Sequence, residues 1–230
     1  MQYITVYNME KILIKINLSA FPAELHKYLK NTTIYDSSCG ENSQVLYSDL
    51  GYYIKIAPKG SLEREATITD YFYDSGIGAE LIKYISADKD YMVTRPAPGQ
   101  DATHYLDNPH KLCETLAASM KYLHSLPMDN IILSPSMEYY KSDNVLICDT
   151  YIHGDFCLPN IMLEDYSFKA FIDVGLAGAG DRHIDIFWCI WSLWFNLKTD
   201  KYTDYFLDLY GRENIDMTKL KYIAIKEDKV

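Results

Sequence analysis

The stretch YIHGDFCLPNIMLEDYSFKAFIDVG, Tyr151 to Gly175, alternates short apolar runs with polar bends. The runs IML and FKAFI are rich in β-branched and aromatic residues, which predicts two short strands joined as a hairpin. HGDFCLPN and DVG then form the loops before and after these strands. The loops contain Asp155, Asn160 and Asp173. The pattern therefore predicts that these three polar side chains gather in a single pocket.

The bulk composition describes an ordinary globular chain. Its 230 residues, 48% hydrophobic and 23% charged, suffice for one large domain or two lobes. The formal net charge of −10 argues against nucleic acid as a partner and is compatible with a cationic substrate. The five cysteines are scattered without a CxxC pair, which argues against disulfides and zinc and favours the cytoplasm.

No segment predicts membrane insertion. The charged residues within the first eighteen positions do not fit a secretory signal. The most apolar run, Ile186 to Leu197, is much shorter than the roughly 20 residues that a membrane span needs. It contains Trp188, Trp191 and Trp194 at spacings of three, which predicts a helix buried in the core.

The first half of the chain predicts a small antiparallel sheet with one helix. The segment NSQVLYSDLGYYIKIA has the pattern of a hairpin that turns around Asp49 and Gly51. SLEREATITDYFYDSG predicts a helix with Ser61 as its N-cap, and AELIKYIS and DYMVT predict two further strands. RPAPGQD, residues 95–101, is a stiff turn and the predicted hinge.

The second half is predicted to be mainly helical. HKLCETLAASMKYLHSL places Leu112, Leu116, Met120 and Leu123 on one helical face. Further helices are predicted at 181–197, 202–210 and 217–227. The fold class is therefore α+β, with a sheet-based N-terminal lobe over residues 1–95 and a mainly helical C-terminal lobe over residues 96–230. The C-terminal lobe carries the loops of Asp155, Asn160 and Asp173.

The polar residues of both halves fit phosphoryl transfer, which needs a metal, a lysine that holds the phosphates and a carboxylate that takes the acceptor proton. Asp155 is the candidate base, and Asn160 and Asp173 are oxygen ligands suited to Mg²⁺. Lys55 lies on a predicted strand, and Glu65, one turn into the next helix, can hold the lysine by an ion pair. A structural alternative is that Asp155, Asn160 and Asp173 only form turns.

Several motifs together resemble a known family. HGDxxxxN is followed by IDxGxxGxxDxxxD, residues 172–185, and is preceded by YYIKI, REATITDYF, APGQD and YLHSLP. In this order they resemble the aminoglycoside phosphotransferases, small-molecule kinases with a two-lobed protein-kinase-like fold. The similarity is greatest to the 3′-phosphotransferase branch, the kanamycin kinases. It implies ATP and Mg²⁺ as cofactors and gives Asp155, Asn160, Asp173, Lys55 and Glu65 the roles suggested above.

The resemblance further implies that the N-terminal lobe binds nucleotide and that the C-terminal lobe is catalytic and binds the substrate. It also implies individual nucleotide contacts. Tyr53 matches an aromatic residue that stacks on adenine, and it lies on the same strand face as Lys55. Arg95 and Ala97 would offer backbone groups to the edge of the base. In the loop SSCGENSQ the family uses a serine, for which Ser43 or Ser38 could serve. This loop holds only one glycine, so a glycine-rich phosphate cradle is not evident.

On the acceptor side, the family binds its polycationic sugar with acidic residues, some of them at the C-terminus. Here Glu227, Asp228 and the carboxylate of Val230 match that position, and a solvated helix end is the alternative. The segment 127–151 is shorter than its counterpart in the family. Leu176 stands where close relatives have an arginine, and the segment just before Asn160 lacks the usual acidic residue.

Four further residues are assigned structural roles. His153 is expected to brace the catalytic loop, Gly154 to permit a tight turn, Asp181 to cap a helix and Asp185 to act as an internal brace.

The sequence thus predicts a cytoplasmic small-molecule kinase that phosphorylates a sugar hydroxyl, the 3′-hydroxyl of an aminoglycoside antibiotic, and so confers resistance. One alternative is a kinase of another hydroxylated or cationic metabolite. Another is a pseudokinase that binds nucleotide as an interaction module. No partnership with nucleic acid or membrane is expected.

Overall fold

The computed structural model describes residues 11–38, 43–128, 132–140 and 145–229. These residues form two compact units. The first unit extends to Ser75 and includes Ala79–Pro96, and the second comprises Gly76–Gly78 and the chain from Ala97 onward.

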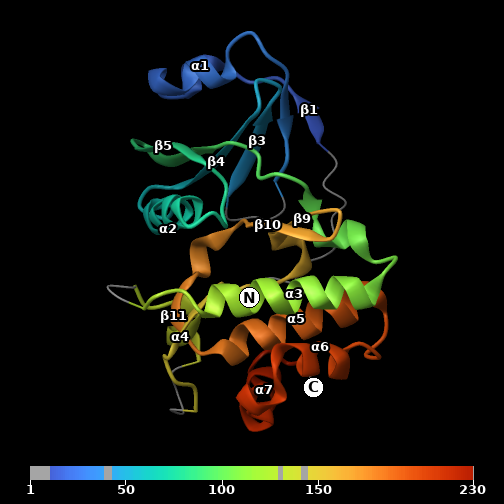
Figure 1. Cartoon of the computed structure of the whole chain (residues 1–230). Coiled ribbons are helices and arrows are strands. Elements are labelled where there is room, and N and C mark those ends of the chain that lie inside the picture. The colour runs from blue at the N-terminus through green and yellow to red at the C-terminus, as the bar shows by residue number, and fades with distance from the viewer. Residues whose placement is uncertain (1–10, 39–42, 129–131, 141–144, 230) are drawn as a thin grey trace. The chain divides into compact units, whose positions relative to one another are not determined.

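The first unit is built on an antiparallel sheet with the strand order β1-β2-β3-β4-β6-β5 (Figure 1). Its strands are β1 (Ile12–Ile14), β2 (Ile34–Asp36), β3 (Gln44–Ser48), β4 (Tyr52–Pro58), β5 (Leu81–Ser86) and β6 (Lys89–Thr94). Its helices are the 3₁₀ turns η1 (Leu18–Ala20) and η2 (Ala23–Leu25), followed by α1 (His26–Leu29) and α2 (Glu63–Asp74). The hairpin of β3 and β4 turns at Asp49 and Gly51 as the sequence predicts.

The two faces of β4 have different partners because side chains alternate along a strand. Ile54 and Ile56 are buried in a cluster that includes Leu25 and Tyr28. Lys55 is paired across the sheet with Met92, which packs with the start of α2. Helix α2 therefore covers the sheet face from which the Lys55 side chain projects.

The N-terminus of α2 differs from the prediction. Ser61 does not cap the helix; its hydroxyl donates to the Pro58 carbonyl at 2.5 Å. The backbone N–H of Leu62 instead donates to Asp90 Oδ2 at 2.9 Å. Burial would raise the pKa of Asp90, but the hydrogen bonds that its carboxylate accepts, first from Leu62, hold this pKa below its usual value. A cap from a strand 28 residues away leaves no local sequence signal.

The second unit combines helices with short strands. Its helices are α3 (Pro109–His124), α4 (Pro135–Tyr139), α5 (Arg182–Leu197), α6 (Thr203–Tyr210) and α7 (Met217–Lys226). Its 3₁₀ turns are η3 (Ala102–Tyr105), η5 (Leu158–Asn160), η6 (Val174–Leu176) and η7 (Arg212–Asn214). Its strands are β7 (Gln100–Asp101), β8 (Thr150–Ile152), β9 (Ile161–Glu164), β10 (Ser167–Phe171) and β11 (Gly178–Gly180).

The predicted helical face of α3 forms the core of this unit. Leu112, Leu116, Met120 and Leu123 are all fully buried. Helix α3 packs against α5 and α6, and α5 packs against α7 (Figure 1). The strands form a sheet of order β10-β9-β7 and a ribbon of β11 with β8. The ribbon and the sheet carry the loops that hold Asp155, Asn160 and Asp173.

Helix α5 contains the three tryptophans, and the prediction of a buried stripe is wrong for one of them. Trp188 is 7% exposed, whereas Trp194 is 50% exposed. Three residues span only about 300° of an α-helix, so a spacing of three moves the side chain around the axis at every step. Among the described residues, no helix is long and apolar enough to cross a membrane.

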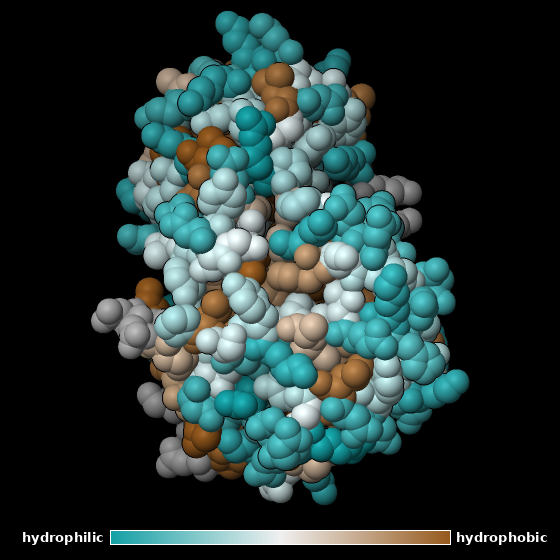
Figure 2. All heavy atoms as spheres, viewed as in Figure 1, coloured by the Kyte–Doolittle hydropathy of each residue, from teal (hydrophilic) through white to brown (hydrophobic). Residues whose placement is uncertain are grey.

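The described cysteines form no disulfide. Cys113, Cys157 and Cys189 are buried as free thiols, and Cys148 is exposed and free. Cys39 lies outside the described residues. On the face shown in Figure 2, hydrophilic residues cover most of each unit and hydrophobic residues form small separate groups.

Candidate active site

The hairpin of β9 and β10 brings two of the predicted site residues to one end. Phe171 pairs with Ile161, and the N–H of Ile172 donates to the Asn160 carbonyl at 3.0 Å. Asn160 therefore enters the hairpin at the place where Asp173 leaves it. Asp173 has a φ of 56°, a left-handed conformation that costs free energy in a residue other than glycine. Such local strain is typical of functional loops.

Asp155 is tied directly to Asn160. The Asn160 amide nitrogen donates to Asp155 Oδ2 at 2.9 Å and to the Asp155 carbonyl at 3.0 Å. Although the Asp155 residue is partly exposed, burial of its carboxylate raises the pKa, and the negative charge of Asp173 adds to the increase. A carboxylate whose pKa is raised accepts a proton more readily, as a general base must.

These residues fit a magnesium ion. Since the Asn160 nitrogen makes both hydrogen bonds, the amide oxygen is the group that remains for a cation. The Asp173 carboxylate supplies a second hard oxygen. Within the described residues, no group of three His, Cys, Asp or Glu side chains forms a metal cage. Mg²⁺ is usually held in this way, by one or two protein oxygens with phosphates and water completing the shell.

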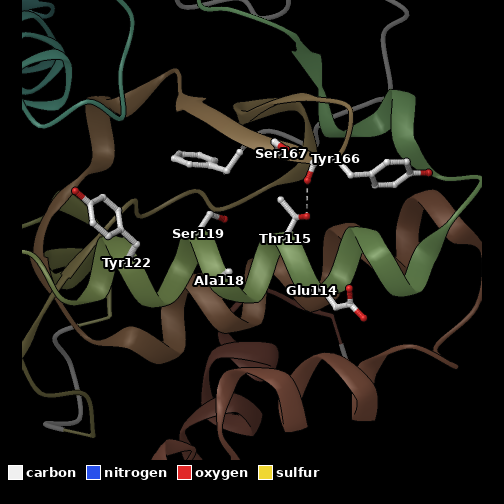
Figure 3. A pocket seen from close by; sticks show the side chains of 8 residues that line it. Glu114, Thr115, Ala118, Ser119, Tyr122, Tyr166 and Ser167 are labelled. Atoms are coloured by element: carbon white, nitrogen blue, oxygen red, sulfur yellow. Dashed lines mark hydrogen bonds between the residues drawn. The ribbon is translucent and has the colours of Figure 1, made fainter.

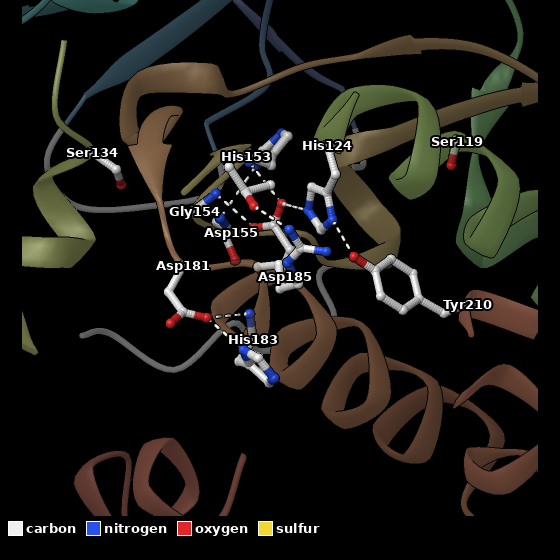
Figure 4. Close-up of polar contacts among 12 residues, drawn as sticks. Ser119, His124, Ser134, His153, Gly154, Asp155, Asp181, His183, Asp185 and Tyr210 are labelled. Carbon is white, nitrogen blue, oxygen red and sulfur yellow. Dashed lines mark hydrogen bonds and ion pairs between the residues drawn. The ribbon is translucent and has the colours of Figure 1, made fainter. Parts of the chain in front are cut away.

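The loop before Asp155 is anchored by a buried carboxylate, as predicted for Asp185 (Figure 4). Asp185 Oδ2 accepts from the N–H of His153, and Oδ1 accepts from the N–H of Gly154, both at 2.8 Å. His124 Nε2 lies 3.1 Å from the same Oδ2 and its Nδ1 lies 2.8 Å from the Tyr210 hydroxyl. Three helices, α3, α5 and α6, thus meet at the carboxylate that fixes the catalytic loop.

His153 and Gly154 have the predicted structural roles. The ring of His153 lies 3.1 Å from the Ile172 carbonyl through Nε2, and its Nδ1 accepts from the Asp155 N–H at 3.3 Å. The histidine therefore links the loop of Asp155 to the strand that leads to Asp173. Gly154 has a φ of +81°, and a Cβ there would lie 2.5 Å from the Leu176 carbonyl oxygen. Only glycine fits both the conformation and the space.

Sequence reasoning missed two positioning residues. It gave His124 no role, although YLHSLP was one of the segments behind the family resemblance. It also passed over Ser192, whose hydroxyl accepts from the N–H of Leu158 at 3.0 Å, within the catalytic loop. A polar residue within the apolar run of α5 was the available signal, since buried polar groups need partners. The cap by Asp181, which accepts from the N–H of His183 at 3.0 Å, was predicted and is confirmed.

In the first unit, Lys55 and Glu65 form the predicted ion pair. Lys55 Nζ lies 2.8 Å from both carboxylate oxygens of Glu65. The side chains are 19% and 8% exposed, so the charges are partly shielded from water. The pair orients an ammonium group on the face of the sheet that α2 covers.

Two of the residues predicted to contact the nucleotide base, Tyr53 and Arg95, lie on or just after the neighbouring strands β4 and β6. Tyr53 faces Thr94 across the strands, and its ring centroid lies 4.9 Å from that of Tyr47. The N–H of Arg95 donates to the Glu80 carbonyl at 3.0 Å. Ala97 begins the second unit.

The predicted serines lie beside a loop that is outside the described residues in part. Ser43 directly precedes β3 and is partly buried. The hydroxyl of Ser38 accepts from the N–H of Val45 at 2.9 Å, so it already has a structural role. Gly40, the single glycine of this loop, lies outside the described residues.

The predicted acidic C-terminus follows α7. Glu227 Oε1 accepts a hydrogen bond of 2.6 Å from the hydroxyl of Tyr140, a residue that is 1% exposed. Asp228 is exposed and has a φ of 52°. Val230 lies outside the described residues.

A shallow groove of about 430 Å³ lies elsewhere in this unit, between α3 and the turn of the β9–β10 hairpin (Figure 3). The hydroxyl of Thr115, on one side of the groove, donates a hydrogen bond of 2.6 Å to the Tyr166 carbonyl on the other side. Its one acidic side chain, Glu114, accepts from the Tyr205 hydroxyl. None of the predicted site residues lines this groove, which offers no group for phosphoryl transfer.

Comparison with known proteins decides the family. Residues 149–223 match the model of a phosphotransferase enzyme family, and this range contains Asp155, Asn160 and Asp173. The chain is 39% identical over 253 residues to a probable aminoglycoside 3′-phosphotransferase of Lactococcus lactis, covering 93% of this chain and 97% of that protein. This chain belongs to the aminoglycoside phosphotransferase family. It is accordingly a phosphotransferase with a hydroxyl acceptor.

Solved structures of aminoglycoside phosphotransferases confirm the predicted two-lobed, protein-kinase-like α+β fold. A type VIII aminoglycoside 3′-phosphotransferase superposes with a TM-score of 0.64 at 19% identity, covering 85% of this chain and 91% of that one. A complex of a related phosphotransferase with AMP-PNP and hygromycin B gives a TM-score of 0.66 at 13% identity, over 89% of this chain and 87% of the other.

Two of the positions at which the sequence is expected to depart from the family lie beside the loop of Asp155. The side chain of Leu176, where an arginine was expected in relatives, lies against Gly154, and its carbonyl accepts from the Ser134 hydroxyl at 2.6 Å. The short segment before β8 contains α4 and touches β11 through the bridge of Leu133 with Ala179. Leu176 thus packs the loop with an apolar side chain instead of presenting a charge.

Proposed function

We propose that this chain is an ATP- and Mg²⁺-dependent aminoglycoside 3′-phosphotransferase. It transfers the γ-phosphoryl group to the 3′-hydroxyl of the antibiotic and thereby confers resistance. Because ATP and Mg²⁺ are supplied in the cytoplasm, we place the reaction there. A relative of this chain carries the name of this activity, and the ATP complex of a structural neighbour with streptomycin is a precedent for the two substrates together.

The second unit supplies the groups that act on the acceptor. Asp155 accepts a hydrogen bond from the sugar hydroxyl and takes its proton as the oxygen bonds to the γ-phosphorus. The bond from that phosphorus to the bridging oxygen breaks in the same step, and ADP leaves. The raised pKa of Asp155 suits it to this transfer. The Asn160 nitrogen holds the carboxylate in place, while Asn160 and Asp173 present oxygens to the metal. The metal, when bound, neutralises charge that develops on the phosphate oxygens.

The first unit is assigned to the nucleotide. Lys55, oriented by Glu65, neutralises negative charge on the phosphates, and Tyr53 stacks on the base. Arg95 and Ala97 offer backbone groups to the base edge, and Ser43 contacts the phosphates. On the acceptor side, Glu227 and Asp228 bind the ammonium groups of the acceptor.

One observation carries the proposal: Asn160 uses its amide nitrogen to fix Asp155 and keeps its amide oxygen for a cation. If Asn160 only formed a turn, its side chain would not need to bind the carboxylate of Asp155 through the nitrogen and face a cation through the oxygen. The kinase reaction requires this link, because base and metal must act on the same phosphoryl transfer.

The test is ADP release by the purified chain with ATP, Mg²⁺ and kanamycin. We expect turnover with kanamycin and none with its 3′-deoxy analogue, which lacks the proposed acceptor oxygen. Simple amino alcohols serve as the comparison for another metabolite kinase. ADP release that ignores every aminoglycoside but responds to an amino alcohol would contradict the assignment. ATP binding without turnover of any acceptor would indicate a pseudokinase.

A further inference from the structure

Helix α5 presents a cluster of aromatic rings that the proposed reaction does not use. The ring centroids of Trp188 and Trp191 lie 5.6 Å apart in an edge-to-face arrangement. The ring of Phe195 stacks on Trp191 at 5.1 Å. Trp191 is therefore the central ring, and it is only partly buried. Its indole N–H is nevertheless buried and meets no hydrogen-bond acceptor among the described residues.

A cation already lies over this ring. Lys229 Nζ is 4.7 Å from the centroid of Trp191, within the range of a cation–π interaction. The position is set by the backbone, because the N–H of Lys229 donates to the Ala224 carbonyl at 2.9 Å. Asp228, in its left-handed conformation, turns the chain back toward the helix. The face of Trp191 thus holds an ammonium group in a structured turn.

The turn that carries Lys229 also carries two acidic residues. Glu227 and Asp228 directly precede Lys229, and Glu227 is held by the hydroxyl of buried Tyr140. Burial, followed by this hydrogen bond, raises the pKa of the Tyr140 hydroxyl, which therefore stays protonated and donates to the carboxylate. An aromatic face attracts a cationic ligand in the same way as it attracts the ammonium of a lysine.

The ring lies on the part of α5 that supports the catalytic loop. Ser192, the next residue after Trp191, accepts from the N–H of Leu158 at 3.0 Å. The thiol of Cys157 lies 3.9 Å from the Trp188 carbonyl. Leu158 and Cys157 belong to the loop between Asp155 and Asn160. Trp191 is therefore the sequence neighbour of a residue that holds the loop of the proposed base.

We propose that the ring of Trp191 is the subsite for an ammonium group of the acceptor, and that Lys229 occupies this subsite in the free protein. The inference rests on the proposed function, since it needs a polycationic acceptor. Binding exchanges the ammonium of Lys229 for one of the substrate over the same ring. The acceptor therefore competes with the protein's own lysine, which selects against neutral sugars that cannot replace the cation.

The test compares Lys229→Met with Lys226→Met, a matched variant that removes a cation 5.4 Å from the ring of Tyr222. We expect Lys229→Met to lower the KM for kanamycin by roughly two- to fivefold, the range of an exposed cation–π contact, with the KM for ATP unchanged. Trp191→Leu should raise the KM for kanamycin by about three- to thirtyfold, and Trp191→Phe by less. Equal kanamycin KM values in Lys229→Met, Trp191→Leu and the unaltered protein would overturn the inference while the proposed function stands.

A second readout does not depend on turnover. Tryptophan fluorescence is titrated with kanamycin in the absence of ATP, and with fully N-acetylated kanamycin as the uncharged control. A saturable change with kanamycin alone, at lower concentration in Lys229→Met than in Lys226→Met, supports the subsite. No change, or the same midpoint in both variants, overturns it. A chain that binds kanamycin in this way but releases no ADP would contradict the proposed function and leave the subsite supported.

Discussion

Replacement of Asp185 by asparagine tests how firmly the catalytic loop is held. The carboxylate is fully buried and accepts from the N–H groups of His153 and Gly154, each at 2.8 Å. Asparagine keeps one acceptor oxygen and turns an NH₂ group toward the other donor. One buried N–H then loses its partner, which costs about 1–3 kcal/mol, and the remaining bond loses its charge assistance. We expect a total loss of about 2–4 kcal/mol in the free energy of unfolding.

A domain of this size shifts its melting temperature by about 2–4 °C per kcal/mol, so the expected decrease is roughly 5–15 °C. All three tryptophans of the chain lie on α5, in the same unit as Asp185, so their fluorescence reports the relevant transition. The control is Asp204→Asn, at a carboxylate that is 84% exposed. Because the anchored loop carries Asp155, kcat should also fall, by about 100-fold for a displacement near 1 Å. A melting temperature no lower than that of the control would refute the reasoning.

Three further predictions follow from individual contacts. Glu65→Gln should lower kcat/KM for ATP by about 10- to 100-fold, since Lys55 loses a partly buried ionic partner. The control Glu164→Gln removes the exposed partner of Lys169 and should leave kcat/KM for ATP unchanged. Burial raises the pKa of Asp181, but the hydrogen bonds from His183 and Lys219 lower it by more, so the net pKa lies well below 3.8. The ionised Asp181 therefore contributes to stability above pH 3.8, and this contribution is lost as the pH falls further. Urea unfolding at pH 5 and pH 3 should therefore show a smaller acid-induced loss for Asp181→Asn than for the unaltered protein, and equal losses would argue against this role. Gly154→Ala should abolish most activity and lower the melting temperature, because the new Cβ meets Leu176. The control Gly60→Ala has a similar positive φ but no atom within 4 Å of the new Cβ, so it should lower the free energy of unfolding by only about 1 kcal/mol. Equal effects of the two variants would show that contact with Leu176 does not matter.

The elements that the sequence predicted well are those with local signals. The periodicity of α3 located its buried face, and alternation located the strand β4 that carries Lys55. The ion pair of Lys55 with Glu65 was also predictable. A lysine on a strand and an acid one turn into the helix that follows can meet when that helix packs back on the sheet.

The elements that were missed depend on contacts between distant parts of the chain. β11 consists of Gly178–Gly180, a composition with low strand propensity, and it is a strand because it pairs with β8. β7 has two residues and exists through pairing with β9. The cap from Asp90 and the anchor by His124 are side chains contributed by other elements. No window of neighbouring residues contains the information for such partners.

The central claim is that Asp155 takes the proton of an aminoglycoside hydroxyl during phosphoryl transfer from ATP. The most direct measurement is kanamycin-dependent ADP release by Asp155→Ala, together with the affinity of the same variant for ATP. The account predicts that turnover is abolished while ATP binds as tightly as in the unaltered protein. Full turnover by Asp155→Ala would contradict it.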